Sequence, residues 1–316
     1  MVLCGIIEDM GKEEVAVLIP CFNEEKTVGK VVKDFRKVIP KAQIFVFDNM
    51  STDKSVDNAK AAGATIVMVP YRGKGNVVRE MFRTVNADIY IMVDADDTYD
   101  AKDAKKMIKY VNDGYDMVVG DRLGSTYFEE NKRFGHNFGN VLVRKLVNMF
   151  FGAKIQDVMT GYRAFSKRFV KTCPVLSNGF QVETEMTIHA LDKKMKIASM
   201  PVGYRDRTQG SESKLNTYKD GTMVMIMLFN LIKEYRPLMF FSVLALVLLI
   251  VALVLGVPVV IDFLASGIVE RFPSLIVATM LVILSFLSFV SGVILDIILK
   301  KSRQQFEIDL NIVGLK

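Results

Sequence analysis

The sequence lacks the patterns that build disulfide frameworks, zinc sites and P-loops. Its three cysteines are widely spaced and form no Cys-x-x-Cys pair, and the two histidines, His136 and His189, lie far apart. This usage excludes a disulfide-stapled scaffold and a Cys/His metal site, and it favours a reducing compartment. No Walker A motif occurs either, so a conventional P-loop is excluded.

A strong charge imbalance and a secretion signal are also missing. The chain has 41 Lys and Arg against 35 Asp and Glu, a net charge of +6. This mild excess fits an anionic membrane surface or phosphate ligands at least as well as nucleic acid, and we expect no nucleic-acid partner. Segment 1–15 has neither a basic region nor a long apolar core, so we expect no signal peptide and a body that starts in the cytosol.

Apolar residues are abundant and concentrate near one end. They make up 51% of the chain, too many for an ordinary soluble domain and too few for many membrane spans. Two runs without charge, 237–261 and 272–295, each reach about 36 Å as helices, more than the roughly 30 Å of a bilayer core. We therefore predict transmembrane helices at about 238–261 and 273–299.

Basic residues flank the outer ends of this predicted hairpin: Lys233, Arg236, Lys300, Lys301 and Arg303. Because cytosolic flanks carry the excess of Lys and Arg, residues 1–236 and the C-terminus are expected in the cytosol. We expect an integral membrane protein, of the cell membrane in a prokaryote or the endoplasmic reticulum in a eukaryote.

Residues 216–236 have the pattern of an apolar helix that is too short to cross a membrane. We expect an amphipathic helix that lies in the membrane interface; a helix packed under the soluble domain is the alternative. The predicted organisation is therefore a cytosolic catalytic domain at 1–215, the interfacial helix at 216–236, and the hairpin with a short cytosolic tail at 237–316.

The soluble part alternates strands and helices. Strands are expected at 15–20, 43–48, 65–69, 88–94 and 117–120, and helices at 24–38, 52–62, 76–85, 101–112 and 182–191. This alternation predicts an α/β fold with a mainly parallel, doubly wound sheet. Ligands of such sheets bind at the carboxyl ends of the strands, which gives the polar residues there a functional interpretation.

Three aspartates, Asp94, Asp96 and Asp97, stand at the end of the fourth predicted strand. Three carboxylates within four residues repel one another unless a cation or solvent compensates their negative charge. Mg²⁺ or Mn²⁺ is commonly held by one or two carboxylates plus substrate phosphates. A solvated acidic loop or a helix cap is the alternative. Asp48 ends another strand and can accept a hydrogen bond from a ligand N–H, whereas Ser51 or Thr52 is expected to cap the next helix.

Two further segments carry candidate phosphate ligands. The run 73–78 has part of a dinucleotide-binding pattern but lacks its third glycine and follows the third strand, so it is weak evidence for a dehydrogenase. Glycines beside arginines, and the mixed loop 204–215, fit a phosphate clamp; plain contacts to lipid headgroups are the alternative. The candidate phosphate ligands in these segments are Lys74, Arg122, Arg163, Arg207, Ser213 and Lys214.

In this order the segments PCFNEE, FDNMSTD, DADD, GDR, DVMTGYRAF and RTQGSESKL resemble glycosyltransferase family 2. The resemblance covers roughly residues 13–236. Within that family, the sequence looks most like the polyprenyl-phosphate glycosyltransferases, a group that includes dolichyl-phosphate mannose and glucose synthases. It implies a GT-A fold and a metal-dependent hexosyltransferase that uses a nucleotide sugar with Mg²⁺ or Mn²⁺.

The resemblance also implies a role for each matching residue. Pro20, Asn23, Glu24, Asp48, Lys74 and Asp94 would bind the nucleotide sugar, with Asp48 at the base. Asp94 and Asp96 would form the metal pair, with Asp96 in contact with the metal. Arg122, Arg163, Arg207, Ser213 and Lys214 would face the acceptor phosphate, and Asp96, Arg122 and Arg207 would be catalytic. Asp157 is expected to orient Arg163 or the acceptor loop.

The implied reaction is an inverting transfer to dolichyl or polyprenyl phosphate at the cytosolic membrane face, for glycan assembly. A phosphate anion needs no general base, so the work is to bring two anions together and to neutralise the leaving diphosphate. Mannose synthases carry Gln where this chain has Thr98, and often Arg-Arg in place of His136 and Asn137. These departures favour UDP-glucose or UDP-N-acetylglucosamine over GDP-mannose.

Other functions were weighed against this one. Processive polysaccharide synthases resemble one another in a Gln-x-x-Arg-Trp motif. This sequence has no Trp, which disfavours that function. A family 2 enzyme with another lipid or glycan acceptor, or a mannose synthase using GDP-mannose, stays open. A membrane-tethered scaffold without activity is disfavoured by the intact Asp94, Asp96 and Arg207.

Overall fold

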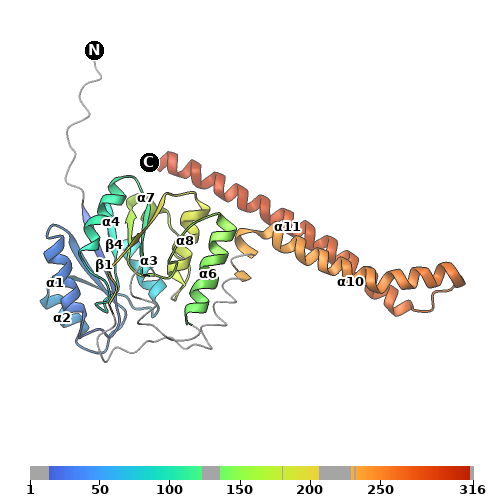
Figure 1. Ribbon diagram of the computed structural model, residues 1–316, viewed down its shortest axis with the longest axis horizontal. Helices are drawn as coiled ribbons and strands as arrows, with labels where there is room; N and C mark the ends of the chain where they lie inside the picture. Colours follow the sequence, from blue (N-terminus) through green and yellow to red (C-terminus); the bar gives the residue numbers. More distant parts are fainter. Residues whose placement is uncertain (1–13, 123–135, 180, 206–228, 231–232, 314–316) are drawn as a thin grey trace, which may run out of the picture. The chain divides into compact units, whose positions relative to one another are not determined.

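The computed structural model describes residues 14–122, 136–179, 181–205, 229–230 and 233–313 (Figure 1). The chain divides into two compact units, Met1–Gly221 with Leu315–Lys316, and Thr222–Gly314. The predicted limits of the three segments stay a prediction. Most of the expected interfacial helix at 216–236 lies outside the described residues.

The first unit is built on one mixed sheet. Its described strands are β1 (Val15–Cys21), β2 (Gln43–Asp48), β3 (Thr65–Met68), β4 (Ile89–Met92), β5 (Met117–Asp121), β6 (Arg163–Ser166) and β7 (Ile197–Pro201). They pair in the order β3-β2-β1-β4-β6-β5-β7. All neighbours are parallel except β6, which runs antiparallel to β4 and β5. The predicted mainly parallel α/β fold is therefore confirmed; β6 and β7 were not predicted.

Helices cover the two faces of this sheet (Figure 1). The described ones are α1 (Val28–Val38), α2 (Ser55–Ala61), α3 (Lys74–Thr84), α4 (Asp103–Asn112), α6 (His136–Phe151), α7 (Lys167–Thr172) and α8 (Val182–Asp192). On one face, Phe35 of α1 and Met107 of α4 join the core with Tyr162. On the other, the rings of Phe82, Phe165 and Phe169 pack at centroid distances of 5.6 and 4.8 Å. These two apolar layers fix the sheet whose carboxyl edge carries the polar loops.

His189 extends the second aromatic layer. Its ring meets the face of Phe169 edge-on at 5.9 Å, and the side chain is buried. Burial, with a smaller contribution from Lys193, lowers the pKa of His189 to about 4. The residue is thus a neutral part of the core.

Acidification should therefore destabilise the fold through His189. Its folded pKa lies below the unfolded value of about 6.5, so this stability is present above pH 6.5 and is lost as pH falls toward about 4. We expect the midpoint of thermal unfolding to fall less over this range in His189→Gln than in the wild type. His136→Gln, a change at the other histidine, should keep the wild-type pH dependence; equal slopes for all three proteins would contradict this role.

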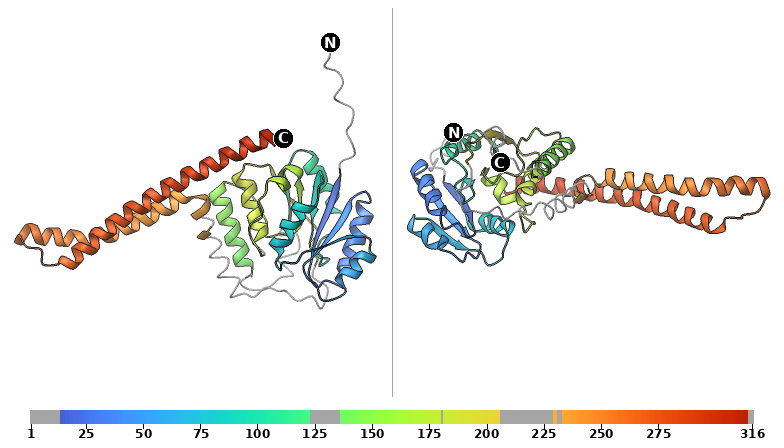
Figure 2. Two further views of the ribbon diagram at one scale, coloured as in Figure 1. Left: turned by 180° about the vertical axis from the view of Figure 1, so that it is seen from behind. Right: turned by 60° about the horizontal axis from the view of Figure 1, so that its bottom comes forward.

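The second unit is a helical hairpin of α10 (Pro237–Ser266) and α11 (Phe272–Val313), which run side by side in Figure 2. Both described helices are long and apolar enough to cross a membrane. They contain the predicted spans at 238–261 and 273–299, and α11 continues beyond the second span as far as Val313. Most of their large apolar side chains are exposed, as expected for surfaces that face lipid.

Small and β-branched residues line the contact between the two helices at seven-residue intervals. They are Ala245, Ala252 and Val259 on α10, and Ala278, Ser285 and Gly292 on α11. The Ser285 hydroxyl donates to the Ala245 carbonyl at 2.7 Å. A Cβ atom at Gly292 would lie 2.8 Å from the Cβ of Phe241, which is too close for an unshifted contact. A spacing of seven matches helices that wind around each other, and small residues let their backbones approach.

Gly292→Leu should separate the hairpin, because the larger side chain meets the α10 backbone and Phe241. Ser291→Leu, at the exposed neighbouring position, makes the same kind of change on the outer face. We expect only the first variant to lower the temperature at which the purified protein in detergent loses its helical circular dichroism signal. Equal losses in both variants would contradict the close packing at Gly292.

Candidate functional site

The carboxyl ends of β1, β2 and β4 lie at one edge of the sheet. The polar residues there are Asn23 and Glu24 after β1, Asp48 at the end of β2, and Asp94 and Asp96 after β4. The loop after β1 is joined to the loop after β2 by hydrogen bonds of Asn23. Its side-chain oxygen accepts the Thr52 N–H at 2.8 Å, and its own N–H donates to the Ser51 hydroxyl at 2.9 Å. Asn23 has a φ of 53°, a left-handed conformation that Asn tolerates better than most residues. Asn23 thus shapes the edge.

The expectation that Ser51 or Thr52 caps the following helix is wrong. Helix α2 begins at Ser55, and the Asp53 carboxylate accepts the Ser55 N–H at 3.0 Å. The Ser55 hydroxyl in turn accepts the N–H of Glu24 at 2.7 Å. The two loops therefore interlock, which fixes the backbone at Glu24.

Asp48 lies at the end of β2 and is only 1% exposed. Its Oδ2 accepts the Ser51 N–H at 3.0 Å, while its Oδ1 has no hydrogen-bond partner among the described residues. A buried carboxylate oxygen without a partner is costly, so an N–H donor of a ligand fits this position well. Pro20, in β1, pairs with Phe47 of β2 one position before Asp48.

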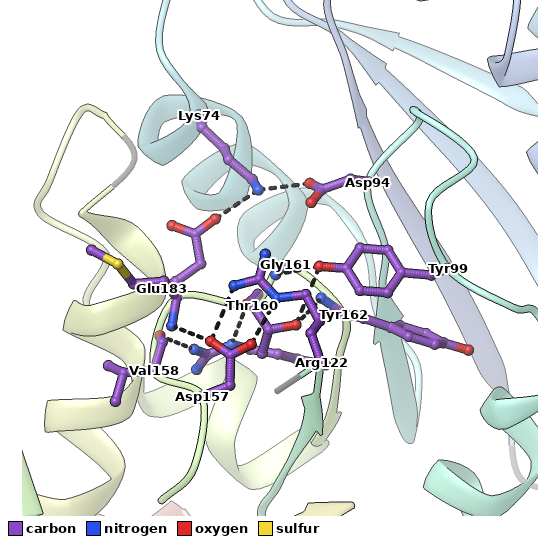
Figure 3. Close-up of polar contacts among 12 residues, drawn as sticks. Lys74, Asp94, Tyr99, Arg122, Asp157, Val158, Thr160, Gly161, Tyr162 and Glu183 are labelled. Atoms are coloured by element: carbon purple, nitrogen blue, oxygen red, sulfur yellow. Dashed lines mark hydrogen bonds and ion pairs between the residues drawn. The ribbon is translucent and has the colours of Figure 1, made fainter. Parts of the chain in front are cut away.

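Asp94 lies opposite two charged side chains that come from other elements (Figure 3). The Lys74 ammonium, at the start of α3, is 2.6 Å from Asp94 Oδ1 and 2.6 Å from Oε1 of Glu183 in α8. Burial disfavours charged Lys74, but the carboxylates of Asp94 and Glu183 outweigh it and raise the Lys74 pKa above its ordinary value. Lys74, predicted to bind the nucleotide, therefore forms an ion pair with Asp94, one of the two candidate metal ligands.

Glu183 was missed by the sequence analysis. It lies in the segment QVETEM, where a glutamate at the start of a helix has the ordinary interpretation of a solvated residue. In the structure its side chain is almost completely buried, and its Oε2 has no hydrogen-bond partner among the described residues. The two glutamates of this segment, at alternate positions, were the signal available in the sequence.

The other two aspartates of the cluster diverge. Asp96 is buried, and its Oδ1 accepts the Thr98 hydroxyl at 2.7 Å and the Thr98 N–H at 3.3 Å. Asp97 has a φ of 58° and pairs with Lys30 of α1 at 2.6 Å. Asp97 therefore serves the exposed side of the loop, whereas Asp94 and Asp96 belong to the site.

These donors fit a metal ion that a substrate completes. Within the residues that the structure describes, no three His, Cys, Asp or Glu side chains form a metal cluster. Mg²⁺ and Mn²⁺ commonly take one or two carboxylates and fill the remaining positions with water and phosphate oxygens. Asp94 and Asp96 supply that number, and their oxygen atoms are the right ligand type for a hard cation.

Asp157 holds Arg122 and not Arg163. The Arg122 guanidinium makes a two-pronged contact, with Nε 2.7 Å from Oδ2 and Nη2 3.1 Å from Oδ1 of fully buried Asp157. It also stands over the ring of Tyr204 at 5.8 Å. Arg122, at the end of β5, is therefore fixed at the edge of the sheet, where a phosphate oxygen can be bound.

Arg163 does not meet the expectation that it binds the acceptor phosphate. It is completely buried, and its guanidinium donates to the carbonyls of Val158 and Thr160 at 2.6 and 3.0 Å and to the Thr187 hydroxyl at 2.8 Å. Burial lowers its pKa to about 10. Position in the central strand β6 turns this cation inward, so it supports the loop 157–160.

That loop leads to Gly161, which lies under Asp94 (Figure 3). A Cβ atom at Gly161 would overlap the Asp94 carboxylate, so any other residue there would force that carboxylate to move. The Gly161 N–H donates to the Tyr99 hydroxyl at 3.3 Å. The segment DVMTGYRAF is thus explained as a support for Arg122 and a floor for Asp94.

The chain then returns toward the aspartate loop. Tyr204 forms a β-bridge with Tyr99, and the Arg205 N–H donates to the Thr98 carbonyl at 2.8 Å. This contact anchors the beginning of the predicted acceptor loop beside Asp96. The predicted acceptor residues Arg207, Ser213 and Lys214 lie outside the described residues.

Comparisons with known proteins agree on the family. The model of the family described as glycosyl transferase family 2 matches residues 16–173. Glycosyltransferase AglJ of Haloferax volcanii is 30% identical over 297 residues, 93% of this chain and 97% of that protein. A dolichyl-phosphate hexose transferase of the same organism is 27% identical over 213 residues, 67% of this chain and 91% of that protein.

The fold has counterparts among solved structures. Glucosyl-3-phosphoglycerate synthase of Mycobacterium tuberculosis, crystallised with Mn²⁺, uridine diphosphate and glucosyl-3-phosphoglycerate, superimposes with a TM-score of 0.57. The match covers 70% of this chain and 80% of that one at 21% identity. This likeness confirms the expected GT-A type of fold.

Breaking the buried pair of Arg122 and Asp157 on one side should destabilise the fold strongly. Removing one charge leaves the other buried and uncompensated, which typically costs about 3–5 kcal/mol. We expect such a loss in the free energy of unfolding of Asp157→Asn, measured with denaturant on the purified protein. Asp100→Asn, at the exposed Arg205 contact of 3.4 Å, should change it by less than about 1 kcal/mol. Similar losses would contradict this assignment.

Proposed function

The chain belongs to glycosyl transferase family 2, and on that premise we propose that it transfers a hexose from a nucleotide sugar to a polyprenyl phosphate. The observation that carries the proposal is that Asp94 and Asp96, which follow β4, lie at the same sheet edge as buried Asp48 at the end of β2, with β1 between the two strands. A diphosphate with its metal and a base N–H would be recognised there together. The resemblance of a dolichyl-phosphate hexose transferase over most of its length supports the acceptor class.

On the donor side, we infer that Asp94 and Asp96 hold Mg²⁺ or Mn²⁺ together with the diphosphate. The metal supplies charge neutralisation of the leaving diphosphate. Asp48 Oδ1 would accept the N–H of the base, and the interlocked loops at Asn23 and Glu24 would hold the nucleoside. The donor is expected to be UDP-glucose or UDP-N-acetylglucosamine, because Thr98 stands where mannose synthases carry Gln.

On the acceptor side, the chain has to bring one phosphate anion up to another. Arg122 is prepared for this because its guanidinium is oriented by Asp157 and Tyr204 before any ligand arrives. The acceptor phosphate oxygen attacks the anomeric carbon without a general base, so a single displacement inverts that centre. Arg207, Ser213 and Lys214 are proposed to complete the acceptor contact.

We propose that the reaction takes place at the cytosolic face of a membrane. A long polyprenyl phosphate keeps its tail in the bilayer and presents its phosphate at headgroup depth. The two apolar helices α10 and α11 suggest that the chain is membrane-associated, which would let enzyme and acceptor share one surface. The cytosolic orientation rests on Lys233, Arg236 and the basic cluster at 300–303.

The test is incorporation of labelled sugar into polyprenyl phosphate by the purified full chain in lipid vesicles. UDP-glucose, UDP-N-acetylglucosamine and GDP-mannose are offered separately, each with Mg²⁺ or Mn²⁺. We expect one UDP-sugar to give an acid-labile lipid product. Asp96→Asn should reduce turnover by at least about a hundredfold, because it removes charge from the proposed metal ligand at constant shape.

Asp97→Asn is the matched control, since Asp97 pairs with Lys30 outside the site, and it should retain most of the turnover. A product with GDP-mannose alone would overturn the donor proposal. Efficient transfer to a free sugar, with none to the lipid, would overturn the acceptor proposal.

A further inference from the structure

The glycines of the run 73–78 make room for another part of the backbone. A Cβ atom at Gly73 would overlap the carbonyl of Asn178, and one at Gly75 would overlap that of Ser177. The Gly75 N–H donates to the Asn178 carbonyl at 3.2 Å. The segment 175–178 therefore lies directly on the start of α3, which explains both glycines without a phosphate.

Two charged side chains clamp the segment 175–178 from opposite sides. Arg79 of α3 donates to the Val175 and Leu176 carbonyls at 2.7 and 2.9 Å. Glu185 of α8 accepts the N–H groups of Leu176 and Ser177 at 2.8 and 3.0 Å. The first turns of α3 and α8 are thus locked together, and this lock brings Lys74 and Glu183 into contact.

The result is one ammonium between two carboxylates. Lys74 is 12% exposed and is equidistant, at 2.6 Å, from Asp94 Oδ1 and Glu183 Oε1. Glu183 has a second oxygen, Oε2, that is buried and has no hydrogen-bond partner among the described residues. The carboxylate of Glu183 therefore has capacity for a second contact with the ammonium.

A divalent cation and Lys74 compete for the same carboxylate. Both are positive, and two cations a few ångströms apart in a poorly solvated site repel each other strongly. Lys74 contacts only Oδ1 of Asp94, but its charge beside the carboxylate opposes a metal at either oxygen. Metal binding at Asp94 therefore favours a shift of Lys74 toward Glu183, the partner within reach. If Glu183 carried no charge, the Lys74 ammonium would keep Asp94 as its ion-pair partner.

We propose that Lys74 is the resident counter-cation of Asp94 and exchanges with the divalent cation, while Glu183 takes over Lys74. The proposal rests on the proposed function, because it takes Asp94 as a metal ligand. Lys74 and Glu183 are positioning residues in this scheme: they set how readily Asp94 becomes available to the metal. A lysine that only contacts the donor phosphates would leave the affinity for metal alone unchanged.

The test is the affinity for Mn²⁺ alone, at neutral pH and without nucleotide, measured on the full chain in detergent by the electron paramagnetic resonance signal of free Mn²⁺. Lys74→Met should bind Mn²⁺ about fivefold more tightly or better, because the competitor is gone. Glu183→Gln should bind it about threefold more weakly or worse, because Lys74 then stays on Asp94. The two variants are expected to change the affinity in opposite directions.

The double variant separates exchange from simple loss of charge. If Glu183 acts through Lys74, then Glu183→Gln should have little effect once Lys74→Met is present. A loss of Mn²⁺ affinity as large in the Lys74→Met background as in the wild type would overturn the proposal, since Glu183 would then act only through its field. Unchanged affinity in Lys74→Met would overturn it as well.

Lys30→Met is the matched control. Lys30 also pairs with an aspartate of the same loop at 2.6 Å, but with Asp97, and it is 50% exposed. Its removal should leave Mn²⁺ affinity within about twofold. Lys74→Gln is measured beside Lys74→Met, with thermal unfolding of each protein, so that one poorly folded variant does not decide the result.

Asp96→Asn distinguishes this proposal from the proposed function. If Asp96→Asn binds Mn²⁺ as the wild type does, or if no protein binds Mn²⁺ even when uridine diphosphate is added, the metal site itself is refuted and the exchange with it. If Asp96→Asn abolishes binding while Lys74→Met and Glu183→Gln change nothing, the proposed function stands and the exchange alone is refuted.

Discussion

The site depends on one buried cation in the middle of the sheet. Arg163, in the antiparallel strand β6, donates to two carbonyls of the loop that precedes it and so fixes the path of that loop. The path places Asp157 against Arg122 and Gly161 under Asp94. Without an inward-pointing guanidinium at this position, the loop that orients Arg122 and lies under Asp94 would have no defined path.

The sequence predicted the parts of the molecule that follow from local pattern. Five strands and the helices between them are readable from periodicity, and Asp48, Asp94 and Asp96 stand out because they end buried strands. Strands β6 and β7 are as short as β3, β4 and β5, but they follow the regular alternation of strands and helices that ends at β5. Their place depends on pairing with segments far away in the chain, which leaves no local signal.

Burial and pairing were the features that the sequence could not supply. Arg163 stands beside a glycine like a surface phosphate ligand, yet the strand direction turns it into the core. Glu183 resembles a solvated residue of a helix start, yet the locked loop buries it against Lys74. The type of each residue was visible in the sequence, but its partners were not. The orientation of Arg163 depends on strand β6, which the sequence pattern did not reveal, and Glu183 pairs with Lys74, more than 100 positions away in the chain.

The seven-residue spacing in the hairpin limits how its length can change. One inserted residue turns everything beyond it by about 100°, which would carry Gly292 from the contact with α10 to the exposed side of α11. Seven inserted residues make nearly two full turns, add about 10 Å and restore the facing. Matched lengthening of the two helices is therefore possible only in coarse steps. If the hairpin spans a bilayer, adjustment to a slightly thicker or thinner one falls to tilt of the hairpin as a whole.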